Sequence, residues 1–359
     1  TSSLAEQNQY WGLYVQDDWK LTSKLTLNWG LRYEYETPVT ERYNRSVAHF
    51  AFDQSSPIEA QTRANYARSP IPELPADQFR VRGGLTFAGV DGNARAYWNG
   101  EKNNLLPRLG LAYQLFPKTV LRTGYGVFFG TIGVNASDSI QTGFSQSTPI
   151  QASLDSGLTY RATNADPFPT GLITPPGARG GLSTNLGQSV SFFEVNRKQP
   201  YVQRWSFGLQ QALPSQFLLE ASYVGSRGTR LGVSRNLNNT PAQYLSRLPV
   251  RDQPTINFLS QQFPNPLSGT NPIYGVNISR ANLLRPFPQF SNVTINEPLG
   301  YSWYQSLQVR GERRFSRGFT FLLAYTWSKT MEATEFLNAT DATPYESIAS
   351  LDRPHHLVV

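Results

Sequence analysis

The chain has 359 residues, a formal net charge of +7 and no cysteine. The lack of cysteine excludes disulfides, thiolate catalysis and cysteine-ligated metals. No apolar run reaches the ~18 residues of a membrane-spanning helix, but this does not exclude a protein that crosses with strands, because such strands are apolar on one face only.

The first predicted element is a hairpin near residues 10–36. In its second half, every second residue from Leu25 to Tyr35 is apolar or aromatic, and Thr, Asn, Gly, Arg and Glu fill the positions between. A period of two places successive side chains on opposite faces of a strand. The run exceeds the ~5–6 residues of a typical soluble strand and matches the ~9–11 residues of a tilted strand that crosses a bilayer.

Three more hairpins repeat this alternation near residues 105–129, 200–224 and 304–328, and a further strand begins within residues 353–359. Turns of a few residues close the hairpins. The connections between hairpins are long and are interrupted by proline, which predicts loops with small local strands over residues 37–104, 130–199, 225–303 and 329–352.

The alternation of short and long connections favours a membrane barrel over a soluble sandwich or propeller. Structureless loops beyond ~12–15 residues are rare in compact domains, whereas membrane barrels combine short turns at one end with long loops at the other. The predicted fold is all-β: residues 1–359 form an antiparallel up-and-down transmembrane β-barrel segment, about nine strands of a larger barrel, with long extracellular loops. The apolar face meets lipid and the polar face lines the interior.

Several sequence blocks, in this order, resemble TonB-dependent outer-membrane receptors. They are YVQDDW (14–19), LTLNWGLRYE (25–34), LLPRLGLAY (105–113), QPYVQRWSFGLQQALP (199–214), LEASYVGSRGTRL (219–231), YQSLQV (304–309), RRFSRGFTFLLAYTWSK (313–329) and DRPHHLVV (352–359). The most similar branch is the Oar-like one, whose members often carry an N-terminal carboxypeptidase-regulatory-like domain.

The resemblance implies energised uptake across the bacterial outer membrane, in which a ligand binds from outside and TonB pulls on a plug inside the barrel. It also implies the partners: the lipid bilayer with its lipopolysaccharide, the TonB complex acting through a plug outside this chain, and an imported ligand. Such barrels have 22 strands. This chain shows nine strands, no plug and no terminal strand that ends in an aromatic residue. We therefore expect an internal piece of a larger receptor, with open first and last strands.

The candidate functional residues are the charged side chains predicted to face the barrel interior. They are Arg32, Glu34, Arg108, Arg122, Glu220, Arg310, Glu312 and Arg314. One interpretation is a structural ladder of cross-strand ion pairs that stiffens the wall or seats the plug; the other is direct contact with the ligand. The positive charge fits either a solvated surface or a basic mouth that attracts an anionic partner.

Aromatic residues in the long loops form a second candidate set. They are Tyr97, Trp98, Phe168, Phe192, Phe193, Phe287 and Phe290. They form either an extracellular binding surface, since aromatic side chains carry much recognition energy, or the packed interior of a folded cap.

No catalytic, cofactor or metal site is predicted, and the chain is not expected to be an enzyme. Nucleophile-elbow, phosphate-loop and metalloprotease motifs are missing, and the adjacent pair His355 and His356 cannot share one strand face. Nucleic-acid binding is not expected, because arginines and aromatics lie on opposite faces of each strand. The alternative functions are an outer-membrane structural or adhesive barrel that binds partners through its loops, and a soluble β-rich secreted domain.

Overall fold

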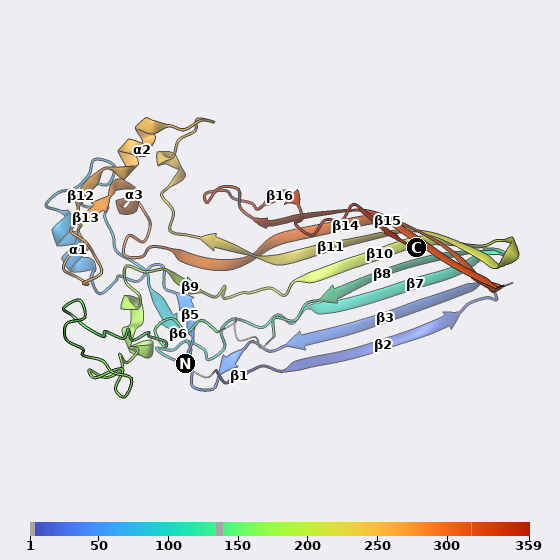
Figure 1. The fold of residues 1–359 in the computed structure, drawn as a ribbon, viewed down its shortest axis with the longest axis horizontal. Coiled ribbons are helices and arrows are strands. Elements are labelled where there is room, and N and C mark those ends of the chain that lie inside the picture. The colour runs from blue at the N-terminus through green and yellow to red at the C-terminus, as the bar shows by residue number, and fades with distance from the viewer. Residues whose placement is uncertain (1–3, 134–138, 317) are drawn as a thin grey trace.

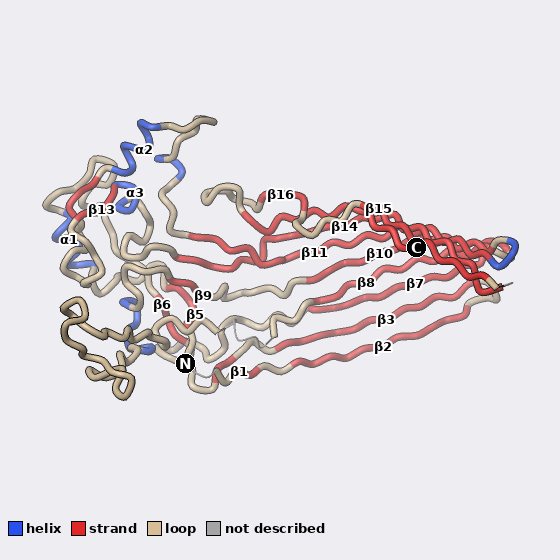
Figure 2. The backbone as a smooth tube through the Cα atoms, viewed as in Figure 1, coloured by secondary structure: helices blue, strands red, loops and turns tan. Residues whose placement is uncertain are grey.

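The structure is a computed structural model that describes residues 4–133, 139–316 and 318–359. Among these residues, nine antiparallel strands form the main sheet, and each is paired with the next along the chain (Figures 1 and 2). They are β2 (Tyr10–Lys20), β3 (Leu25–Glu36), β7 (Asn104–Phe116), β8 (Thr119–Phe129), β10 (Tyr201–Ala212), β11 (Phe217–Asn236), β14 (Val293–Ser316), β15 (Phe319–Glu335) and β17 (His355–Val358). The predicted antiparallel up-and-down sheet of about nine strands is confirmed.

Short turns join the strands of each hairpin at one end of the sheet. The turn between β10 and β11 is a 3₁₀ segment, η2 (Pro214–Gln216), where proline fixes one backbone angle. The turn between β14 and β15 contains Gly318, whose φ of +79° lies in the left-handed region that glycine adopts without strain.

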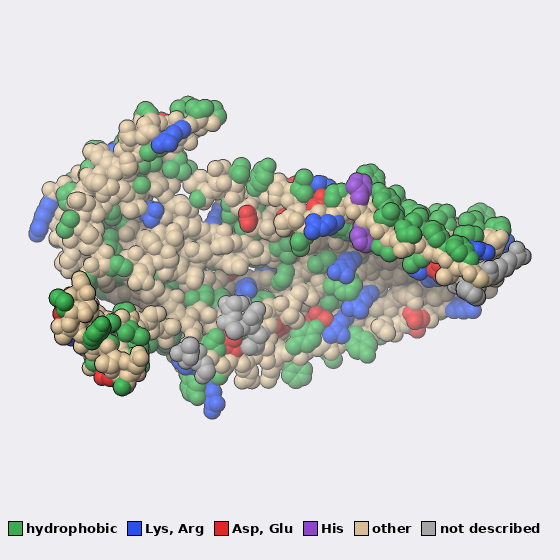
Figure 3. Space-filling model, viewed as in Figure 1, with side chains coloured by type: hydrophobic (Ala, Val, Ile, Leu, Met, Phe, Trp, Pro, Cys, Tyr) green, Lys and Arg blue, Asp and Glu red, His purple; other side chains and the backbone are tan. Residues whose placement is uncertain are grey.

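The register keeps the apolar side chains of all these strands on one face. Leu27 pairs with Trp19 on one side and Leu111 on the other, and Leu307 pairs with Tyr223 and Trp327. Directly opposed residues lie on the same face of a sheet. The side chains of this face are exposed, for example Trp19 at 56% and Trp327 at 58%. Figure 3 shows hydrophobic side chains massed on the outer side of the C-terminal strands, and charged side chains in the hollow of the sheet.

Three strands extend beyond their predicted ends. β15 runs to Glu335, so the loop predicted over residues 329–352 begins too early. β11 continues to Asn236 and β14 begins at Val293, so the loop predicted over residues 225–303 is wrong at both of its ends. The backbone ladder continues there, with Arg235 opposite Ile295, past irregularities on either side of Leu231. Polar residues occupy both faces of this outer part of β11, so the alternation that revealed the strand is missing.

The long connections fold together into a cap at the end of the sheet opposite to the short turns (Figure 1, left). Its helices are α1 (Glu59–Tyr66), α2 (Gln253–Ser260) and α3 (Arg280–Leu283), with the 3₁₀ segments η1 (Gly177–Ser183) and η3 (Ala242–Tyr244). Its strands are β1 (Glu6–Gln7) with β4 (Thr40–Glu41), β5 (Val47–Phe50) with β6 (Leu85–Phe87), and β12 (Gln262–Pro264) with β13 (Asn277–Ser279). Two short strands join the main sheet: β9 (Val190–Phe192) beside β14, and β16 (Tyr345–Ile348) beside β15.

The buried apolar residues of the chain lie mainly in this cap. One cluster joins Phe50, Leu85, Phe192 and Val293, which come from four separate segments. A second cluster surrounds Leu283, and a third contains Tyr97, Trp98 and Phe193. None of the helices among the described residues is long and apolar enough to cross a membrane.

Candidate functional site

The charged residues of the polar face form ion pairs along strands. The Arg32 Nε–Glu34 Oε1 distance is 2.5 Å, and the Arg310 Nη2–Glu312 Oε2 distance is 2.8 Å. Both pairs join residues two apart, which share one face of a strand. Glu220 lies opposite Arg310 in the ladder, yet no ion pair links them in the part of the chain that the structure describes. The interpretation of these residues as a cross-strand ladder is therefore wrong for these pairs, because each arginine meets its carboxylate on its own strand.

A cluster of two arginines around one aromatic ring lies further along the polar face. The guanidinium carbons of Arg108 and Arg204 lie 4.9 and 5.7 Å from the centre of the Phe128 ring. Gly126 pairs with both arginines, and a Cβ added at Gly126 would lie 2.9 Å from the ring, so the glycine makes room for it. Cation–π contacts orient the two guanidinium groups, while both arginine side chains remain exposed.

The eight predicted residues do not converge on one point. Arg32 and Arg108 line a hollow of about 310 Å³ on β2, β3 and β7, together with Tyr14 and Gln16. Arg310 and its neighbours lie several strands away, on β11 and β14.

Two of the predicted residues stand apart from these groups. Arg122 lies opposite Ala112 and Gly208 and is exposed, without an ion pair in the described ranges. The side chain of Arg314 lies outside what the structure describes.

Sequence reasoning missed Glu36, which anchors the cap to the sheet. Its carboxylate accepts hydrogen bonds from the side-chain amides of Asn8 and Gln199, both at 2.7 Å, and from the backbone N–H groups of Ile132 at 2.9 Å and Gly133 at 2.6 Å. Glu36 is the last residue of β3 and is only 7% exposed. One buried carboxylate therefore joins the N-terminal segment and the second long connection to the rim of the sheet.

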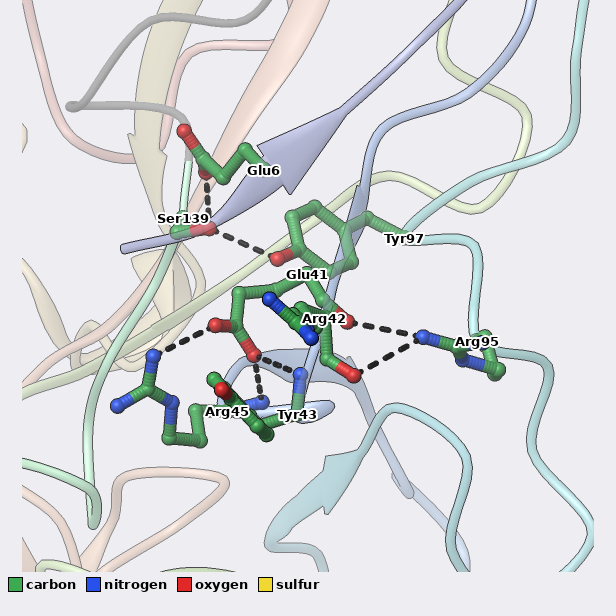
Figure 4. A network of polar contacts seen from close by, with 8 residues as sticks. All are labelled: Glu6, Glu41, Arg42, Tyr43, Arg45, Arg95, Tyr97 and Ser139. Atoms are coloured by element: carbon green, nitrogen blue, oxygen red, sulfur yellow. Dashed lines mark hydrogen bonds and ion pairs between the residues drawn. The ribbon is translucent and has the colours of Figure 1, made fainter. Parts of the chain in front are cut away.

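Glu41 forms a similar anchor within the cap (Figure 4). It accepts hydrogen bonds from Arg45 Nη2 at 2.7 Å and from the backbone N–H groups of Tyr43 at 2.7 Å and Arg45 at 3.0 Å. Burial alone would raise the pKa of the Glu41 carboxyl, but these donors outweigh burial and hold the pKa below its ordinary value. Beside it, the Tyr97 hydroxyl lies 2.8 Å from that of Ser139.

A third carboxylate, Glu101, links two connections to β11. Arg230 Nη1 lies 3.0 Å and Lys198 Nζ 3.5 Å from its Oε1 atom, and the backbone N–H of Gln199 donates to its Oε2 atom at 3.0 Å. Arg230 sits at the irregularity in β11 with a φ of +60°. Strand bulges redirect side chains in this way, and here the bulge accompanies a contact between Arg230 and the cap.

Most of the predicted loop aromatics pack inside the cap. The rings of Tyr97 and Phe193 stack with their centres 5.2 Å apart, and Phe287 packs edge-on against Phe50 at 5.0 Å. Trp98, Phe192 and Phe290 are also buried in these clusters. Phe168 is half-exposed and lies outside them. The interpretation as a packed interior is thus confirmed for all of the set except Phe168.

The consecutive residues His355 and His356 lie on β17. His355 is opposite Trp327 and His356 is opposite Thr326, so the two occupy different faces as expected. The Tyr325 hydroxyl lies 2.8 Å from His355 Nδ1. Across the described residues, no three His, Asp or Glu side chains are grouped so as to hold a metal ion.

Comparison with protein families gives one match that covers the whole chain: the profile of the outer membrane beta barrel domain matches residues 1–359. No curated protein matches the sequence.

Solved structures are similar to this chain over nearly all of its length. The match to a chain of the FpvAI–pyocin S2 complex covers 99% of this chain and 26% of the other chain, with 8% identity and a TM-score of 0.41. The match to the ferripyoverdine receptor of Pseudomonas aeruginosa, bound to ferripyoverdine, covers 99% of this chain and 26% of the receptor, with 8% identity and a TM-score of 0.40. The match to the alcaligin receptor FauA from Bordetella pertussis covers 90% of this chain and 30% of the receptor, with 11% identity and a TM-score of 0.34. The chain thus spans between 26% and 30% of the length of these proteins.

Proposed function

Because this chain belongs to the outer membrane beta barrel domain family and lies in the bacterial outer membrane, we propose that it forms part of the wall and cap of a TonB-dependent receptor that takes up a ligand by energised transport. The observation that carries the proposal is the division of the chain into a two-faced sheet and a folded cap. The sheet exposes its apolar side chains on one face, and in the membrane these side chains contact lipid. The cap covers the end of the sheet from which a ligand would enter.

The sequence blocks supply the finer assignment. Their order along the chain supports a TonB-dependent receptor, and their similarity to the Oar-like branch makes that branch the proposed one. In this proposal the plug that contacts TonB is supplied by a part of the receptor outside this chain. The chain itself contributes structure and recognition and carries no enzymatic step.

The residues of this chain have two roles in the proposed uptake. The buried carboxylates Glu36, Glu41 and Glu101 tie separate loops together, so the cap is preorganised before a ligand binds. The exposed Arg108 and Arg204 on the polar face then offer cationic contacts along the wall. On the apolar face, Arg227 lies near the middle of β11, beyond the apolar residues 217–223 and opposite Gln203 and Trp303, and there it can meet the phosphates of lipopolysaccharide.

Uptake in matched cells with and without a functional TonB complex tests this function. Both strains express the full-length protein in a defined medium of sugars, peptides and iron chelates, and mass spectrometry follows which compounds are depleted. We expect at least one compound to be depleted only in the TonB-proficient strain. A double variant, Arg108→Gln with Arg204→Gln, should slow this depletion, whereas Arg227→Gln, which removes a charge from the outer face, should not.

Equal depletion in both strains would contradict energised transport. Retention of whole cells on a surface or partner, with no TonB-dependent depletion, would instead establish the structural or adhesive barrel.

A further inference from the structure

The β12–β13 hairpin and α3 lie together in the cap (Figure 1, upper left). Residues of these elements and of the segment that leads to β14 line a polar pocket. Its volume is about 300 Å³, which is the lower end of the range for small-molecule sites and corresponds to a compact ligand. Its polar lining consists largely of side-chain amides and hydroxyls: Gln262, Asn265, Asn277, Asn282, Ser279 and Ser291. No Asp or Glu contributes to this lining.

The one cation in the lining, Arg285, has no acidic partner among the described residues. Its Nη1 donates to the backbone carbonyl of Ser291 at 2.9 Å, while its Nε is buried without a hydrogen-bond acceptor. Burial lowers the pKa of the guanidinium. The Nε of the nearby Arg280 is also buried without a hydrogen bond, but Arg280 has a counter-charge, because this Nε lies 3.4 Å from a carboxylate oxygen of Glu73. A partly buried cation without a counter-ion is costly, so a bound anion would relieve that cost.

The rest of the lining narrows the class of anion. A phosphate or sulfate needs hydrogen-bond donors alone, whereas an amide carries two donor hydrogens and an oxygen with two acceptor sites. Gln262 and Asn265 each use one amide hydrogen on a backbone carbonyl and keep the other for a ligand. Ligand hydroxyl groups need both donors and acceptors. Tyr274 and Phe290 add aromatic surface to the pocket, and the Tyr274 hydroxyl is held by the carbonyl of Gln289 at 2.7 Å.

We propose that this pocket binds an acidic sugar unit, with the carboxylate on Arg285 and the hydroxyls on the surrounding amides. A planar carboxylate matches the fork of guanidinium donors. The inference goes beyond the transport function, since the pocket binds its ligand whether or not TonB drives uptake.

Isothermal titration of the protein purified from outer membranes in detergent tests this pocket, with sodium D-glucuronate as the probe. Glucose serves as the neutral control and inorganic phosphate as the anionic control. We expect glucuronate to bind, and Arg285→Gln to weaken binding at least tenfold, because charge-assisted hydrogen bonds are lost. Glucose and phosphate should bind far more weakly than glucuronate.

Two further variants separate a loss of binding at the pocket from a general effect of mutation on the protein. Asn277→Trp leaves Arg285 in place but fills the pocket from an exposed position, and it should abolish binding. Arg251→Gln removes an exposed charge outside the pocket and should leave affinity unchanged. The proposal is overturned if glucuronate fails to bind the unaltered protein, if Arg285→Gln and Asn277→Trp bind as tightly as it does, or if phosphate binds as well as glucuronate. Since TonB is absent from the titration, failure here leaves the transport proposal untouched.

Discussion

The sheet and the cap of this protein use apolar residues in opposite ways. On the sheet, Leu109 and Phe207 are 58% and 53% exposed, whereas in the cap Phe79 and Leu283 are each only 1% exposed. Both regions belong to one chain of ordinary composition. The difference shows that the sheet is built for an apolar surrounding and that the cap carries its own hydrophobic core in water.

The two regions also treat charge differently. On the polar face the ion pair of Arg310 and Glu312 is exposed and that of Arg32 and Glu34 is partly buried, while the cap buries the carboxylates of Glu36 and Glu41 beneath several donors. Exposed pairs contribute little to stability, but removing a partner from a buried charge is costly. Cap stability should therefore depend on a few side chains, and sheet stability on lipid contact and the backbone ladder.

The largest expected effect is the loss of a cap core residue. Leu283→Ala should destabilise the cap by about 2–5 kcal/mol, because it leaves a cavity in a packed cluster. The matched variant Leu209→Ala, at an exposed position of the sheet, leaves no enclosed cavity and should not affect the cap. Proteolysis of the cap under increasing urea, on protein in lipid vesicles, measures both. Equal protease resistance of Leu283→Ala and the unaltered protein would show that the cap has no such core.

A charge placed on the lipid face should come next in size. Phe207→Arg, near the middle of β10, should cost about 2–4 kcal/mol of folding free energy in vesicles, the cost of arginine at the bilayer midplane. Ser206→Arg places the same charge at the same depth on the polar face and should cost far less. The urea dependence of tryptophan fluorescence gives both values. A larger cost at Ser206 than at Phe207 would mean that the two faces had been assigned the wrong way round.

Acid should weaken the cap through Glu41. Its carboxyl has a pKa below the ordinary 4.5, so the stability it contributes is present above that value and is lost as the pH falls through the lower pKa of the folded state. Cap proteolysis between pH 7 and pH 3 should therefore show a smaller pH dependence in Glu41→Gln than in the unaltered protein. The variant should start from a lower stability at pH 7. Parallel pH profiles for the two proteins would contradict this role.

The smallest effect is expected for the exposed pairs of the wall. Arg310→Gln removes the ion pair with Glu312 and should change the folding free energy by less than about 1 kcal/mol. The same urea titration in vesicles measures it. A loss of several kcal/mol would show that the pair is part of a buried network with a protein segment on the polar face.

The strands could be predicted because the bilayer imposes a local pattern on the sequence. Lipid on one side and water on the other give a period of two that is visible within a single strand, as in residues 25–35. In the outer part of β11, Gly, Ser and Arg interrupt the pattern. In the outer part of β14, Val293, Ile295, Leu299, Tyr301 and Trp303 still alternate, but Glu297 and Pro298 break the run between them. The outer ends of these strands, such as Arg235 opposite Ile295, were therefore missed.

The cap could not be predicted in the same way, because its contacts join residues far apart in the chain. Phe50, Phe192 and Val293 meet in one cluster, yet nothing in the local sequence around each of them indicates the others. Glu36 looks like one more polar residue of an alternating strand, and only the fold shows that four donors converge on it. The charged residues of the polar face could be predicted from the alternation. Their ion-pair partners could not, because each arginine contacts a carboxylate two residues along its own strand rather than one on the neighbouring strand.

The orientation of the two faces can be measured directly, because the chain contains no cysteine and single cysteines can be labelled without background. Spin labels at positions 307, 308, 309 and 310 of β14, on protein in lipid vesicles, report collisions with oxygen from lipid and with a nickel reagent from water. The account predicts that labels replacing Leu307 and Val309 collide with oxygen, and that labels replacing Gln308 and Arg310 collide with nickel. Labels that show no alternation, or the reverse alternation, would contradict it.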